Sequence, residues 1–134
     1  MVRKYEEVEE QEAERLRKIS KPIDQSIVEE LSLERGDLEE VLKAPVRVVP
    51  VGAMEPFYGW HHWSLLDGKP KTVEIFIEDR PKDEQKFLLK HESCHSKVMA
   101  QTPNYPSLSE EEKEELVRKC EIGIGMRGRC SRVF

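Results

Sequence analysis

The spacing of apolar residues changes along this chain, and that change restricts the fold more than any other feature of the sequence. Residues Thr72–Glu78 alternate between apolar and polar side chains, which is the period of a β-strand. Beyond Pro81 the apolar and histidine positions recur at the spacing of one helix face, in Phe87, Leu88, His91, His95 and Val98. Because helical patterns also precede the strands, the order predicts an α+β fold: N-terminal helices, a small, mostly antiparallel sheet, a central helix and a C-terminal helix.

The expected elements can be placed along the chain. Charged residues 3–18 predict a helix with a thin apolar face, formed by Tyr5, Val8, Ala13 and Leu16. Further helices are expected over Ile23–Leu33 and Gly36–Lys43, and strands over Val46–Val51, Trp60–Leu66 and Thr72–Glu78, the last with Glu74 and Glu78 facing water. We assign residues 1–20 to a charged N-terminal segment and 21–134 to one domain. The segment is either a solvated surface helix or a detachable cover for a cleft.

Length and composition narrow the class of protein. The 134 residues fit one domain, 37% of them are charged, and the net charge is −5. No basic stripe indicates a nucleic-acid partner, and no apolar run or signal peptide indicates a membrane. Three cysteines fit a reducing compartment without a disulfide framework. We therefore expect a cytoplasmic protein.

Residues His91–His95 spell H-E-x-x-H within the predicted central helix. Residues four apart lie on one helix face, so both imidazoles can bind one metal ion with the carboxylate of Glu92 beside it. Zinc held this way lowers the pKa of a bound water to near 7, and Glu92 can accept the proton of that water. Chance produces the same five letters in some chains of this composition, but here both histidines continue the inward apolar stripe.

The strand followed by this helix, VEIFIEDRPKDEQKFLLKHESCH, resembles the zincin metallopeptidases. Within them, the small size and the phrase QKFLLKHESCH resemble ImmA/IrrE-type peptidases and archaeal minigluzincins. The resemblance implies zinc-dependent hydrolysis of a peptide or protein substrate, whose backbone pairs with the 72–78 strand as an edge strand. The pentapeptide is its specific part, and the metzincin spacing of a third histidine is absent.

A catalytic zinc needs a third protein ligand, which in the gluzincin-like zincins is a glutamate on a later helix. Ser109 and Glu112 predict a capping box that starts such a helix. The resemblance favours Glu115, twenty residues after His95, as the ligand, although Lys119 stands where an acidic residue is expected. Glu121 is the alternative, and the other acidic residues of this helix also compete, namely Glu110, Glu111, Glu112 and Glu114.

Other residues have structural and functional interpretations side by side. His61 and His62, and with less support Tyr58 and Tyr105, are candidates to stabilise an oxyanion, although histidines packed by aromatic residues are more common. Cys94 fits a small buried side chain better than a redox or metal role. Two rival functions also stay open: a non-catalytic metal-binding sensor or interaction module on the same fold, and a helical interaction protein in which the motif is accidental.

Overall fold

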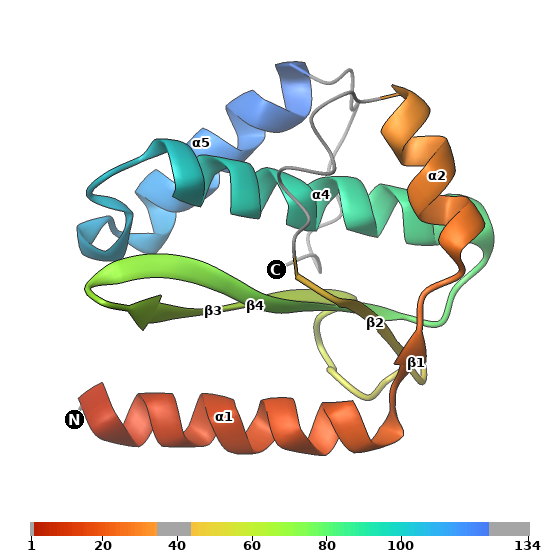
Figure 1. The fold of residues 1–134 in the computed structure, drawn as a ribbon, viewed down its shortest axis with the longest axis horizontal. Coiled ribbons are helices and arrows are strands. Elements are labelled where there is room, and N and C mark those ends of the chain that lie inside the picture. Colours follow the sequence, from red (N-terminus) through yellow and green to blue (C-terminus); the bar gives the residue numbers. More distant parts are fainter. Residues whose placement is uncertain (1, 35–43, 124–134) are drawn as a thin grey trace.

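The computed structural model describes residues 2–34 and 44–123, and the expected helix Gly36–Lys43 lies outside these ranges. The elements are α1 (Val2–Ile19), β1 (Lys21–Pro22), α2 (Gln25–Glu34), β2 (Val46–Val49), β3 (Gly59–Leu66), β4 (Lys69–Glu78), α4 (Lys82–Gln101), a 3₁₀ turn (Tyr105–Ser107) and α5 (Glu110–Gly123). Figure 1 shows three layers, with α1 on one face of the sheet and α2, α4 and α5 on the other. The predicted α+β class is confirmed.

The sheet has the strand order β1-β2-β4-β3. β4 pairs in parallel with β2 and antiparallel with β3, so both of its edges are occupied. The prediction that the 72–78 strand is an edge open to substrate is therefore wrong. The long outer strand is β3, which joins β4 through the turn at Asp67 and Gly68. Both turn residues have positive φ, 53° and 78°, as a tight two-residue hairpin requires.

Three hydrophobic clusters occur among the described residues, and two of them pack against β4, one on each face of the sheet. On the α4 face, Ile75 and Ile77 of β4 pack with Leu88 and Leu89 of α4. The same cluster contains Ile27 and Leu31 of α2 and Ile23, which precedes that helix. The alternation of β4 sends its next residue, Phe76, to the opposite face.

Helix α1 contributes to the core on that opposite face. Ala13 and Leu16 are completely buried, and they pack with Phe76, Val49 and Met54. The predicted apolar positions Ala13 and Leu16 are thus confirmed as inward, while Glu14 and Lys18 on the outer side of the helix are exposed, as expected for a surface helix. The side chains of Tyr5 and Val8, which complete the expected apolar face, lie outside the described side chains.

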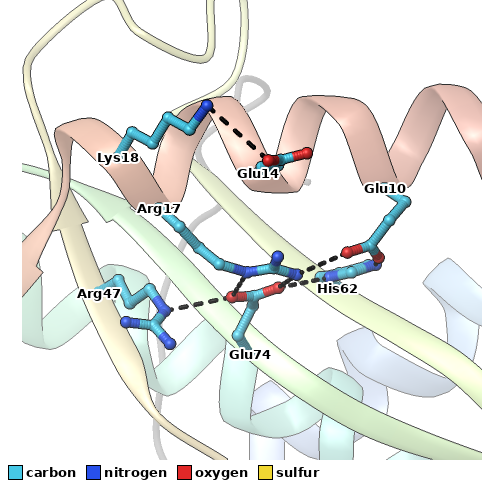
Figure 2. Close-up of polar contacts among 7 residues, drawn as sticks. All are labelled: Glu10, Glu14, Arg17, Lys18, Arg47, His62 and Glu74. Carbon is cyan, nitrogen blue, oxygen red and sulfur yellow. Dashed lines mark hydrogen bonds and ion pairs between the residues drawn. The ribbon is translucent and has the colours of Figure 1, made fainter.

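Glu74 and Glu78 are buried on the α1 face, which corrects the expectation that they face water. Arg17 donates from Nε and Nη2 to the two carboxylate oxygens of Glu74, each at 2.7 Å, and His62 Nδ1 lies 2.7 Å from Glu74 Oε2 (Figure 2). Burial alone raises the pKa of Glu74, but the hydrogen bonds from Arg17 and His62 outweigh it and bring that pKa below the ordinary value of 4.5. α1 is thus joined to the sheet by charge as well as by apolar packing.

Helix α5 begins as the sequence predicts. The Glu112 amide donates to Ser109 Oγ at 3.1 Å, and the Ser109 amide donates to Glu112 Oε1 at 3.2 Å, which is a reciprocal capping box. This cap fixes the start of the helix and therefore which side chains turn toward α4. Among the described residues, no helix has the length and apolar character needed to cross a membrane.

Candidate metal centre

His91 and His95 occupy successive turns on the buried face of α4, with 1% and 7% of their surfaces exposed. Their Nε2 atoms are 3.1 Å apart, and the rings meet edge to face. Two nitrogens bound to one tetrahedral zinc at 2.0–2.1 Å lie about 3.3 Å apart. The histidine pair therefore has nearly the separation that a shared metal ion requires.

Glu121 of α5 binds the other ring nitrogen of His91. Its Oε1 lies 2.8 Å from His91 Nδ1, and both side chains are buried. A carboxylate in this position orients a ligating imidazole and leaves Nε2 to face the metal. Glu121, the alternative third ligand, thus contacts His91 at Nδ1, the ring nitrogen that does not face His95.

Glu114 is a second α5 carboxylate near the histidine pair, on the side of His95. Its Oε1 lies 3.8 Å from His95 Nε2, whereas Glu115, the residue favoured as third ligand, is exposed. The described residues contain no group of three His, Cys, Asp or Glu side chains already arranged to hold a metal ion. Glu114 would have to move toward the histidines to complete such a set, and its side chain, 31% exposed, is not enclosed on every side.

Glu92 lies between the two histidines in sequence and is completely buried. Neither of its carboxylate oxygens has a hydrogen-bond partner within the described residues. Burial and, second, the nearby charge of Glu121 raise the pKa of Glu92 well above 4.5. A buried carboxyl group without a partner is costly to keep, so it indicates a chemical role more strongly than a structural one.

The backbone of β3 approaches Glu92 closely at Gly59. A Cβ atom added at this glycine would lie 2.9 Å from Glu92 Oε1, closer than real contacts allow. The lack of a side chain at residue 59 therefore makes room for the carboxyl group between α4 and the sheet.

His61 borders the site from β3, while His62 points to the other face of the sheet. The ring of His61 stacks on His95 with centroids 5.8 Å apart, and its Nε2 lies 2.8 Å from Thr72 Oγ1, which in turn lies 3.0 Å from Ser96 Oγ. Burial, and then repulsion from His62 and His91, lower the pKa of His61 to about 3. A neutral imidazole has one N–H donor and one acceptor nitrogen, so His61 can both donate and accept a hydrogen bond beside His95, whereas His62 Nδ1 is paired with Glu74.

A disulfide joins Cys94 of α4 to Cys120 of α5, with Cα atoms 5.7 Å apart. This corrects the expectation of no disulfide and of Cys94 as a small apolar side chain. Cys94 lies within the motif beside His95, and Cys120 precedes Glu121. The cross-link therefore fixes α5 against α4 between the two histidine–glutamate contacts. Cys130 lies outside the described residues.

A cleft of about 530 Å³ opens beside the histidine pair. His95 and Glu114 line it, while His91 and Glu92 are not among its lining residues. Its walls carry the aromatic side chains of Trp60, Trp63 and Tyr105. The Tyr105 side chain packs edge to face on Trp63, and burial is the first cause that raises the pKa of Tyr105 to about 12. The cleft gives a ligand access to the one histidine of the pair that reaches the surface.

Comparison of the chain with family models, curated proteins and solved structures gave no match. The site must therefore be interpreted from its own geometry. Sequence analysis selected His91, Glu92 and His95, which the structure brings together. Among the competing glutamates the sequence favours Glu115 over Glu114, although Glu114, Val117 and Glu121 recur at the spacing of one helix face, and the burial of Val117 identifies that face.

Proposed function

We propose that the protein is a zinc-dependent peptidase in which His91, His95 and Glu114 bind the metal ion and Glu92 is the general base. The observation that carries the proposal is the pairing of two Nε2 atoms 3.1 Å apart with a completely buried carboxyl group that has no partner among the described residues. Glu121 supports the proposal because it holds His91 in the orientation that a ligand needs.

When bound, zinc would supply a Lewis acid for the substrate carbonyl and a more acidic water molecule. In its ionised form Glu92 would be the group that accepts a proton from the attacking water and passes that proton to the leaving amine. His61 lies against His95 at the cleft and is the described side chain best placed to contact the carbonyl oxygen as its charge develops.

The substrate backbone is expected to pair with β3. The outer strand lines the cleft with residues Trp60–Leu65, so an extended segment added there passes beside His95. Main-chain hydrogen bonds to a strand edge hold a peptide extended, which is the conformation in which a single peptide bond is presented for attack.

The test combines metal content with hydrolysis. Protein reconstituted with zinc and freed of excess metal is expected to contain one zinc per chain by elemental analysis. Glu114→Gln should weaken zinc binding by about 10–100-fold or more, and the matched change Glu115→Gln should leave it unaltered. An equal loss in both variants, or a loss in Glu115→Gln alone, would contradict the assignment of Glu114.

Glu92→Gln separates catalysis from metal binding. The variant should keep its zinc and lose hydrolysis of an unstructured protein substrate by about 100-fold or more, since the base is removed and the ligands stay. Unaltered hydrolysis would refute the role of Glu92. Zinc binding by a parent protein that cleaves no peptide would instead support the alternative, a metal-binding sensor or interaction module.

A further inference from the structure

The outer edge of β3 has no partner strand among the described residues, and it is long. β3 spans eight residues, whereas β1, at the opposite edge of the sheet, has two, and one of them is a proline that has no amide hydrogen to offer. Leu65 and Leu66 near the end of β3 are 53% and 54% exposed. Proteins normally protect such an edge, because its free N–H and C=O groups template another strand.

Both sides of this edge carry carboxylates. Glu9 and Glu10 of α1 line the cleft on one side of the sheet, and Glu110 and Glu114 of α5 line it on the other. Figure 1 shows α1 and α5 on opposite faces of the sheet. Glu10 reaches toward the sheet between Arg17 and His62, 3.1 and 3.9 Å away (Figure 2). A chain added to β3 would therefore run between two acidic walls.

The position of Lys113 shows that the cleft accommodates a positively charged amine. Its ammonium group lies 5.2 Å from the ring centre of Trp63 and 4.9 Å from that of Tyr105, and 3.6 Å from Glu110. Among the described residues that line the cleft, Lys113 is the single lysine or arginine. The aromatic faces and carboxylates of the cleft thus already accommodate an amine of the chain itself.

Successive side chains of a strand point to opposite faces of its sheet. The partner of β3 consequently presents one residue to the α1 wall and the next residue to the α5 wall. We propose that the cleft recognises an extended peptide segment containing two adjacent basic residues, one paired with Glu9 and Glu10 and the other with Glu110. The interpretation of this binding preference as substrate selection rests on the proposed peptidase function. A second copy of this chain fits the cleft poorly, because its net charge is −5 and its own edge bears the same carboxylates.

Binding can be measured without cleavage in the full-length Glu92→Gln variant. The chain has two tryptophans, and both line the cleft, so tryptophan fluorescence reports occupation of this site. The probes are three capped octapeptides of Thr and Val that differ only in a central Lys-Lys, Gln-Gln or Glu-Glu pair. We expect Lys-Lys to bind about 10-fold or more tightly than Gln-Gln and Glu-Glu to bind most weakly, with the difference shrinking as salt is raised.

Charge removal on each wall provides the decisive comparison. Glu9→Gln and Glu110→Gln should each lower the preference for Lys-Lys, and the double variant should abolish it. The control is Glu14→Gln, because Glu14 is exposed on α1, pairs with Lys18 and does not line the cleft (Figure 2). Equal affinity for the three peptides, or a preference kept by the double variant, would overturn the proposal. The proposal would also be overturned if sedimentation showed that two copies of the chain associate and that the peptide does not bind.

The two proposals fail separately in this design. Peptide preference measured with and without zinc does not depend on hydrolysis, so a protein that selects Lys-Lys yet neither binds zinc nor cleaves keeps this inference and loses the peptidase function. A protein that cleaves peptides with no charge preference keeps the peptidase function and loses this inference.

Discussion

Reduction of the Cys94–Cys120 disulfide should destabilise the whole domain, and the size of the effect follows from the sequence separation of the two cysteines. The cross-link closes a loop of 26 residues, which in the chain-entropy treatment removes about 3.5 kcal/mol of conformational freedom from the unfolded chain at 25 °C. Measured disulfides often contribute less than this value, so we expect a loss of about 2–4 kcal/mol in the free energy of unfolding. For a chain of this size that loss lowers Tm by about 8–16 °C.

The assay is urea denaturation followed by far-UV circular dichroism, with and without a phosphine reductant that does not bind zinc. Cys130 is replaced by Ser in every sample so that disulfide exchange is prevented. Cys120→Ser in this background should have the stability of the reduced parent and should no longer respond to the reductant.

Two results would refute this reasoning. One is a change of less than about 0.5 kcal/mol on reduction, which is far below the loop-closure value. The other is mass spectrometry of the alkylated, unreduced protein that finds both thiols free. A change confined to the α5 signals in hydrogen exchange, with global stability intact, would mean that the helix opens locally and that the cross-link acts on α5 alone.

Three further predictions concern buried charge. Glu92→Gln should stabilise the zinc-free protein at pH 7 by about 1–3 kcal/mol, because burial raises the pKa of Glu92 above its unfolded value and an uncharged amide removes that ionisation cost; lower stability in urea would contradict this. Gly59→Ala should cost about 1–3 kcal/mol through the 2.9 Å approach to Glu92, and a second change, Glu92→Ala, should recover part of that loss; no recovery would refute the contact. The depressed pKa of Glu74 contributes stability that is complete above pH 4.5 and is lost as pH falls through its lower folded-state pKa. Glu74→Gln should therefore cost about 2 kcal/mol at pH 7, discounted because Arg17 is partly exposed, and should flatten the acid limb of a stability–pH curve; an unchanged limb would contradict the ion pair.

Local patterns predicted the elements well where a single period dominates. The strands at Trp60–Leu66 and Thr72–Glu78, the capping box at Ser109 and the inward stripe of α4 all follow from residues that are close in sequence. The motif residues could be selected in the same way, because a helix alone brings i and i+4 together.

The errors arose where burial depends on a distant element. Glu74 alternates as an outward residue should, but it is buried because Arg17, 57 positions earlier, folds over that face and neutralises it. The edge position of β3 follows from β2 joining β4 in parallel, which no local pattern encodes. Glu114 and Glu115 are adjacent acids with the same propensities, so only the rotation of α5 against α4 separates them, and the disulfide helps to set that rotation.

The order of synthesis gives the packing of α1 a kinetic consequence. During translation α1 leaves the ribosome before β4, the strand that supplies Phe76 and Glu74 to its buried face. At about 5–20 residues per second, the 57 residues between Arg17 and Glu74 take about 3–11 seconds to make. Through that interval Ala13 and Leu16 lack the sheet face that buries them. The apolar face of α1 therefore stays exposed to solvent or is bound by a chaperone until the β3–β4 hairpin forms and packs against it.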